Sequence, residues 1–197
     1  MGNNFIITIG REYGSGGFEI GKKLAESLGI AFYDKNLIDE VAKKSGIQLA
    51  TLHKGDEKAA SIWFNPVFKN GTLNDRIFWA QSDVILDIAE KESCVIIGRC
   101  ADYILRDKEN VIKVFIQAPF EDRVDRVANK YLIEIPEEAK KEILKTDKQR
   151  RSYYEFYTDN TWGGRKHADL IVNSSVLGID GTVELIREFV LRKLGAK

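Results

Sequence analysis

Short apolar runs alternate with helical patterns along the chain. Four runs are predicted to be strands buried on both faces of a parallel sheet, at residues 5–9, 94–97, 111–116 and 170–172, and residues 30–33 form a weaker fifth candidate. Between these runs, apolar residues recur at helical spacing, as in Ile20, Leu24 and Leu28, in Val84, Ile85, Ile88 and Ala89, in Val124, Val127 and Tyr131, and in Val183, Ile186, Val190 and Leu194. Strands that alternate with helices predict an α/β fold built of βαβ units around a parallel sheet.

Two segments break this alternation. Residues 36–83 contain no strand pattern, and residues 130–166 are polar, helical and locally basic. A sheet domain closes its core without either segment, so we interpret both as insertions that can cover a ligand. The prediction is therefore a single domain over residues 1–197, with a core made of residues 1–35, 84–129 and 167–197.

The overall charge balance narrows the classes of partner. The 197 residues include 30 basic and 30 acidic side chains, so the net charge is zero and a broad anionic partner such as nucleic acid is not expected. No apolar stretch reaches the roughly 18 residues of a membrane span, and the first residues lack the features of a signal peptide. With two cysteines, too few for a disulfide framework, the protein is expected to be soluble, reduced and cytoplasmic. Nothing in the sequence indicates an oligomeric state.

A glycine-rich stretch directly follows the first predicted strand and leads into a helix. Backbone N–H groups in such a loop converge with the helix N-terminus on one point and bind phosphate without any particular side chain. The alternative is a tight βα turn whose glycines only pack the helix against the sheet. We predict a phosphate-binding loop made of Tyr13, Gly14, Ser15, Gly16, Gly17 and Phe18.

The loop differs from the usual phosphate loop at two positions. The usual loop ends in Gly-Lys-Ser/Thr, in which the lysine contacts the β- and γ-phosphates and the hydroxyl binds magnesium. Here Gly17 stands at the lysine position and Phe18 at the hydroxyl position. One charge-assisted contact contributes about 1.5–3 kcal/mol, so efficient transfer requires another cation in place of the lysine. Arg11, which can lean over the loop, is the candidate.

Further motifs accompany the loop. They are Ile-Thr-Ile-Gly-Arg-Glu-Tyr-Gly-Ser-Gly-Gly at 7–17, Gly-Ile-Ala-Phe-Tyr-Asp at 29–34, Val-Ile-Ile-Gly-Arg-Cys-Ala-Asp-Tyr-Ile-Leu at 95–105, Ile-Gln-Ala-Pro at 116–119, Tyr-Tyr at 153–154 and Leu-Ile-Val-Asn at 170–173. With these motifs, nearly the whole chain resembles the cytidylate-kinase-like family of phosphate-loop proteins. The resemblance implies a nucleoside monophosphate kinase fold: three αβα layers, a five-stranded parallel sheet, an acceptor-binding helical insertion at 36–83 and a mobile lid at 130–166.

The resemblance also implies roles for two residues that follow strands. Arg99 stands where the family has an arginine that holds the acceptor phosphate, although Cys100 takes the family's acidic position and Asp102 comes two residues later. An exposed arginine at a strand end is the alternative. Asp34 closes the second strand near the loop and can hold Mg²⁺ through water, whereas an ordinary helix N-cap is the other interpretation.

Four arginines lie in the region that the family uses to close on the transferred phosphoryl group. Arg123 and Arg126 are one helical turn apart, and Arg150 and Arg151 are adjacent. The resemblance suggests that Arg123 and at least one of the second pair contact this group, because guanidinium groups form bidentate contacts with phosphate. Asp147 can orient Arg150 by a salt bridge. A solvated basic helix face is the alternative for all four arginines.

On this resemblance, we predict a phosphotransferase that uses ATP and Mg²⁺ to phosphorylate a nucleoside monophosphate, with CMP or dCMP as the leading acceptor. Two alternatives stay open. The residues at positions 17 and 18 favour a nucleotide-binding or regulatory protein that has the fold without efficient transfer. A kinase of another small acceptor is also compatible, since the insertion has no recognisable specificity motif. The predicted catalytic residues are Arg11, Arg99, Arg123, Arg150 and Arg151.

Overall fold

The fold is known from a computed structural model, which describes residues 4–34, 73–133 and 135–195. Within these residues, one sheet contains five parallel strands in the order β2-β3-β1-β4-β5. Each predicted run overlaps one strand, so the predicted five-stranded parallel sheet is confirmed. The strands are β1 (Ile6–Arg11), β2 (Ala31–Tyr33), β3 (Cys94–Ile97), β4 (Val111–Gln117) and β5 (Leu170–Asn173).

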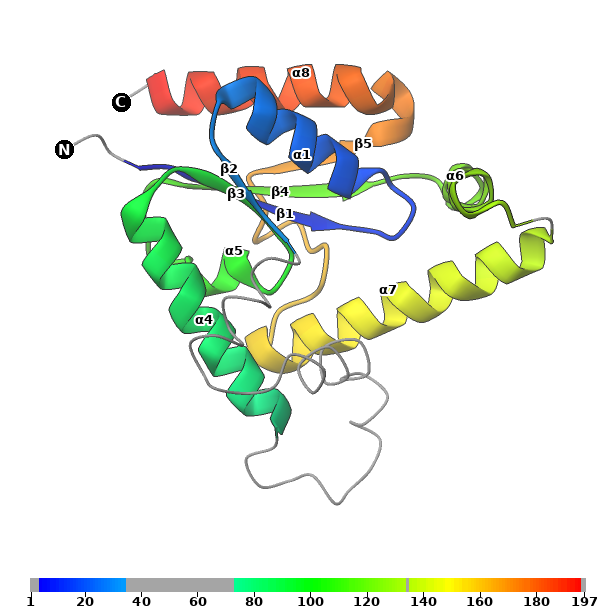
Figure 1. The fold of residues 1–197 in the computed structure, drawn as a ribbon, viewed down its shortest axis with the longest axis horizontal. Coiled ribbons are helices and arrows are strands. Elements are labelled where there is room, and N and C mark those ends of the chain that lie inside the picture. The colour runs from blue at the N-terminus through cyan, green and yellow to red at the C-terminus, as the bar shows by residue number, and fades with distance from the viewer. Residues whose placement is uncertain (1–3, 35–72, 134, 196–197) are drawn as a thin grey trace.

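Helices cover both faces of the sheet (Figure 1). On one face lie α1 (Gly17–Leu28) and α8 (Ser174–Gly195), which is broken at Gly178. On the other face lie α4 (Leu73–Lys91), the short α5 (Ala101–Ile104) and α7 (Pro136–Thr158). The remaining helix, α6 (Phe120–Tyr131), follows β4 and packs against α7. The three-layer αβα prediction is therefore confirmed.

Aliphatic side chains hold the layers together. Ile7 and Ile9 of β1 pack with Ile20 and Leu24 of α1, and all four are fully buried. A second cluster on the opposite face joins β1 and β3 to α4 and α5, with Ile85 at its centre. Burial of one such side chain contributes about 1.5–3 kcal/mol. Because both faces are packed in this way, the loops at the carboxyl edge of the sheet stand on a rigid base.

The two predicted insertions have different outcomes. Of residues 36–83, the part from 73 onward belongs to α4, and the rest lies outside the described residues. The predicted lid at 130–166 contains α7 and the segment that follows it, so its helical character is confirmed. No helix in the described part of the chain combines the length and the apolar character that crossing a membrane requires.

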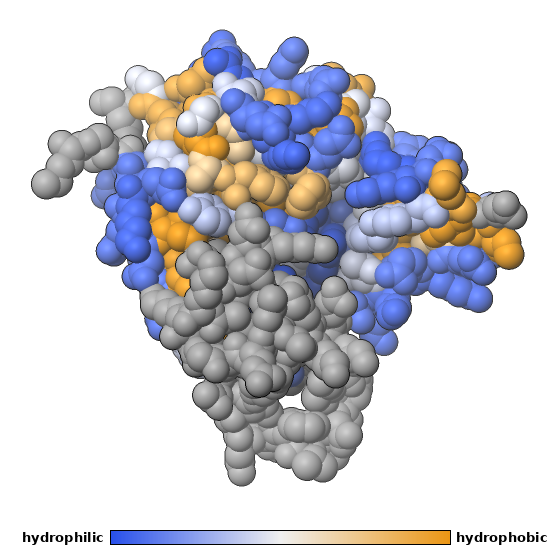
Figure 2. All heavy atoms as spheres, in the orientation of Figure 1, coloured by the Kyte–Doolittle hydropathy of each residue, from blue (hydrophilic) through white to orange (hydrophobic). Residues whose placement is uncertain are grey.

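The outer end of α6 and α7 departs from the sequence prediction. Val124 and Val127 are buried as predicted, but Tyr131 is 52% exposed, so its assignment to the apolar face of α6 is wrong. Figure 2 shows apolar atoms gathered at this end of the molecule, where Leu132 and Ile135 are exposed. The outer ends of α6 and α7 therefore form an apolar tip that projects away from the sheet (Figure 1).

The buried hydroxyl of Thr8 generates a prediction about stability. Thr8 lies in the middle of β1 at 2% exposure, and its Oγ1 has no hydrogen-bond partner among the residues that the structure describes. Because an unsatisfied buried hydroxyl is unfavourable, Thr8→Val is expected to raise the free energy of unfolding by about 1 kcal/mol. Urea denaturation measures this change.

Thr182 is the matched control, since it is also fully buried but its hydroxyl donates a hydrogen bond of 2.5 Å to the Gly178 carbonyl. Thr182→Val is expected to lower the free energy of unfolding by about 1 kcal/mol. Equal destabilisation by both substitutions would contradict the assignment of an unsatisfied hydroxyl to Thr8.

Candidate functional site

A cavity of about 1170 Å³ opens at the carboxyl edge of the sheet. Its lining comes from the loop between β1 and α1, the turn after β3, the helices α6 and α7, and residues 162–168. Ligands of open parallel α/β sheets bind at this edge, where the loops that follow the strands converge. Pockets for one small molecule measure roughly 300–1,000 Å³, so this cavity has room for two substrates.

The glycine loop keeps its shape through internal contacts. Ser15 is fully buried, and its hydroxyl donates to the Glu12 carbonyl at 2.9 Å. The hydroxyl of Ser174 donates to the Ser15 carbonyl at 2.6 Å. Ser15 therefore supports the loop from behind, whereas the other predicted loop residues line the cavity at the N-terminus of α1, where anions are favoured. They are Tyr13, Gly14, Gly16, Gly17 and Phe18.

The side chain of Arg11 leaves no room for a side chain at residue 17. Arg11 is the last residue of β1, and its Cβ lies 2.6 Å from the point where a Cβ of residue 17 would stand. Its guanidinium group lies against Gly98 after β3, so closely that a Cβ on Gly98 would overlap with it. A side chain at either glycine would therefore displace Arg11 from its place beside the loop.

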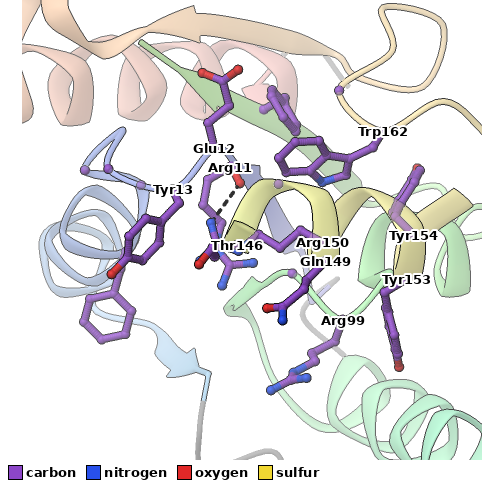
Figure 3. A pocket seen from close by; sticks show the side chains of 18 of the residues that line it. Arg11, Glu12, Tyr13, Arg99, Thr146, Gln149, Arg150, Tyr153, Tyr154 and Trp162 are labelled. Carbon is purple, nitrogen blue, oxygen red and sulfur yellow. Dashed lines mark hydrogen bonds between the residues drawn. The ribbon is translucent and has the colours of Figure 1, made fainter. Parts of the chain in front are cut away.

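Three arginines bring their charges into the same cavity (Figure 3). Arg11 comes from β1, Arg99 from the turn after β3 and Arg150 from α7, and Arg150 Nη1 donates to the Arg11 carbonyl at 3.2 Å. Burial and then the charge of Arg150 lower the pKa of Arg11 to about 9, against the opposing effect of Asp34. Burial also lowers the pKa values of Arg99 and Arg150. An anionic ligand would relieve this excess of desolvated positive charge.

Asp34 lies in the cavity at the end of β2, as the sequence predicts. The described residues contain no group of three or more metal-binding side chains. Phe18, at the position of the usual metal-binding hydroxyl, packs edge-on against Phe32 with ring centroids 5.4 Å apart. One carboxylate beside a phosphate-binding loop still fits Mg²⁺, because this ion takes most of its ligands from water and substrate phosphates.

The other predicted arginines lie outside the three-arginine cluster. Arg123 is buried, and its Nη1 forms an ion pair of 2.5 Å with Asp147 and donates to the Tyr13 carbonyl at 3.2 Å. Arg126 donates to the Gly14 carbonyl at 2.5 Å. Arg151 lies over the ring of Trp162, 5.7 Å from its centroid. Arg123 thus supports the loop from outside the cavity, Arg126 binds the loop and also lines the cavity, and Arg151 packs on the segment that follows α7.

Several residues of the site were missed or misplaced by sequence reasoning. The ion pair of Asp147 is formed with Arg123 of α6, not with Arg150 as the sequence suggests. Glu12 accepts the Ala118 N–H at 3.0 Å and so ties the loop to the end of β4. Spacing along one helix cannot reveal either contact, because both join segments more than 20 residues apart.

The end of α7 is fixed to the core by tyrosines. Tyr154 donates to Asp102 at 2.6 Å, and burial raises the pKa of that carboxyl group. Tyr157 stacks on Phe78 of α4 with ring centroids 4.0 Å apart. Tyr153 donates to Gln81 at 3.2 Å. This half of α7 is therefore anchored, and its lining residues stand at fixed positions in the cavity.

Known sequences that resemble this chain belong to one family of kinases. The sequence model of the Cytidylate kinase-like family matches residues 6–176. A cytidylate kinase of Ignicoccus hospitalis is 26% identical over 191 residues, which cover 94% of this chain and 99% of that protein. A cytidylate kinase of Pyrococcus horikoshii is also 26% identical, over 94% of this chain and 88% of that protein.

Solved structures agree with the fold. An uncharacterized protein from Eubacterium ventriosum is similar with a TM-score of 0.74 and 32% identity, over 95% of this chain and 98% of that one. A shikimate kinase from Bacteroides thetaiotaomicron has a TM-score of 0.57 and 15% identity, over 94% and 98% of the two chains. The second similarity supports the kinase fold alone.

The lowered pKa of Arg11 predicts how anion binding depends on pH. The charged guanidinium binds phosphate, and its charge in the ligand-free protein is lost as the pH rises through about 9. A bound anion raises this pKa again, so the dissociation constant for ATP is expected to increase about tenfold between pH 8 and pH 10. Isothermal titration calorimetry measures this constant.

The control is Arg11→Met, which removes the titrating group. This variant is expected to bind ATP more weakly than the wild type, and its dissociation constant for ATP is expected to change by less than about threefold over the same pH range. Equal affinities of the wild type and Arg11→Met for ATP at pH 8 would contradict the role of Arg11.

Proposed function

Because the chain belongs to the cytidylate kinase-like family, we propose that it transfers the terminal phosphoryl group of ATP to a nucleoside monophosphate. The observation that carries the proposal is the convergence of Arg11, Arg99 and Arg150 on the glycine loop in one cavity. Phosphoryl transfer requires alignment of donor and acceptor and neutralisation of charge on the phosphate oxygens, with little covalent chemistry from the protein. The partly buried guanidinium groups of these arginines supply the neutralisation.

The donor nucleotide binds at the glycine loop. The backbone N–H groups of residues 14 and 16–18 and the N-terminus of α1 receive its phosphates, and Arg11 supplies the charge of the usual lysine. Asp34 would hold Mg²⁺ through water, and the bound ion would supply neutralisation of charge on the phosphate oxygens. Arg150 stands on the opposite side of the transferred group, where α7 covers the loop.

The acceptor binds on the side of Arg99. This residue holds the acceptor phosphate, and one of that phosphate's oxygens attacks the γ-phosphorus of ATP. The bond from the γ-phosphorus to its bridging oxygen breaks, so that ADP leaves and a nucleoside diphosphate forms. CMP or dCMP is the leading acceptor, on the strength of the family alone. A cytoplasmic location and the absence of a nucleic-acid partner stay predictions from the sequence.

One observation favours a second candidate function. The loop lacks the usual lysine at Gly17 and the usual hydroxyl at Phe18. A protein that binds nucleotides in this cavity without efficient transfer would have the same loop. Transfer to another small acceptor is the remaining alternative, and the same assay separates all three.

Incubation with labelled ATP, Mg²⁺ and a panel of nucleoside monophosphates and small hydroxyl compounds tests the proposal. Formation of a labelled diphosphate at about one turnover per second or more is the expected result. Arg99→Ala is expected to raise the KM for the acceptor about tenfold or more, with a smaller effect on the KM for ATP, because one charged contact is removed.

Arg192→Ala is the matched control, since Arg192 is exposed near the end of α8 and pairs only with Glu188 of the same helix among the described residues. Its kinetic constants are expected to equal those of the wild type. Tight ATP binding without transfer to any acceptor would contradict the kinase proposal and support the second candidate.

A further inference from the structure

Asp147 connects the lid helix to the glycine loop. Its Oδ1 accepts the backbone N–H of Tyr13 at 2.7 Å, and its Oδ2 forms the ion pair with Arg123 at 2.5 Å. The Asp147 side chain is only 14% exposed. Both carboxylate oxygens are thus used in a nearly dry environment, where charge-assisted hydrogen bonds are strong.

Arg123 is itself held in place. Its side chain is 9% exposed, its Nε lies 3.5 Å from Glu12 Oε2, and its Nη1 also reaches the Tyr13 carbonyl. Glu12 in turn accepts the N–H of Ala118 at the end of β4. A continuous chain of contacts therefore runs from β4 through Glu12 and Arg123 to Asp147.

Asp147 and Arg150 are one helical turn apart on α7 and bind neighbouring groups of one backbone segment. Asp147 accepts the Tyr13 N–H, and Arg150 donates to the Arg11 carbonyl at 3.2 Å. These two contacts set both the distance and the rotation of α7 relative to the loop. They also bring the guanidinium of Arg150 close to that of Arg11, although the two charges repel each other.

We propose that Asp147 is a positioning residue for phosphoryl transfer: by binding the Tyr13 amide and Arg123, it holds α7 against the glycine loop so that Arg150 faces the transferred group. Without this contact, repulsion from Arg11 moves Arg150 outward. The inference rests on the proposed function, because Arg150 has a role only if transfer occurs. The opposite role, in which the carboxylate occupies an anion position and blocks it, is an outcome of the test.

The test compares Asp147→Ala and the isosteric Asp147→Asn with the wild type in the same kinase assay. A displacement of about 1 Å lowers rates up to a hundredfold, so Asp147→Ala is expected to lower kcat by about 100-fold and Asp147→Asn by about tenfold. The dissociation constant for ATP is expected to change by less than about threefold, because the loop and Arg11 stay in place. Thermal unfolding confirms that each variant is folded.

A double variant separates positioning from a general structural role. If Asp147 acts through Arg150, Asp147→Ala lowers kcat by less than about threefold when it is introduced into Arg150→Ala, because coupled residues are not additive. Glu138→Gln is the control on the same helix, since Glu138 is an exposed carboxylate in the first turn of α7. Its kcat is expected to equal that of the wild type.

Three results would overturn the inference. The first is an unchanged kcat in Asp147→Ala, and the second is that the effects of the two substitutions multiply fully in the double variant. The third is an increase in kcat, or a tenfold tighter binding of ATP, in Asp147→Asn. This third result would show that the carboxylate blocks an anion position. A wild-type protein that transfers no phosphoryl group would overturn the proposed function, and with it the reaction that Arg150 serves. If the wild type transfers the phosphoryl group and Asp147→Ala leaves kcat unchanged, only the inference about Asp147 is overturned, and the proposed function stands.

Discussion

The space between β1 and the start of α1 accommodates one side chain, and this steric constraint determines how the glycine loop carries its charge. Arg11 fills that space from the strand side, so residue 17 has no room for the lysine that the usual phosphate loop places there. The guanidinium then needs the bare backbone of Gly98 beside it. Two glycines and one arginine on three different segments thus form a single unit, in which a side chain at either glycine would displace the arginine.

The position of Arg11 at the end of β1 also explains why α6 and α7 must be held in place by contacts to the loop. A guanidinium at the end of β1 stands close to those of Arg99 and Arg150, and burial makes their repulsion unfavourable in the absence of an anion. Contacts to the loop backbone from Arg123, Arg126 and Arg150 hold α6 and α7 in position despite this repulsion. The cavity therefore combines a rigid frame with a concentration of positive charge, which is the arrangement that preorganised electrostatic catalysis requires.

The fold was predictable because its signals are local, whereas much of the site depends on contacts across the chain. Continuous apolar runs identified all five strands, since strands buried on both faces leave such runs. Glycines after β1 marked the loop, and the missing lysine pointed to Arg11. Arg123 and Asp147, however, lie on different helices, and their pairing follows from the packing of α6 on α7. Tyr131 fits the helical period of α6 but falls beyond the part of that helix that is covered, so it does not belong to the buried face that Val124 and Val127 form.

A crystal structure of the protein with a non-hydrolysable ATP analogue and Mg²⁺ tests most directly whether Arg11 replaces the loop lysine. The predicted result has the β- and γ-phosphate oxygens within hydrogen-bond distance of the amides of residues 14 and 16–18, with the Arg11 guanidinium on the same oxygens. A triphosphate bound in the loop with Arg11 still turned toward Gly98, and another cation on its phosphates, would contradict it.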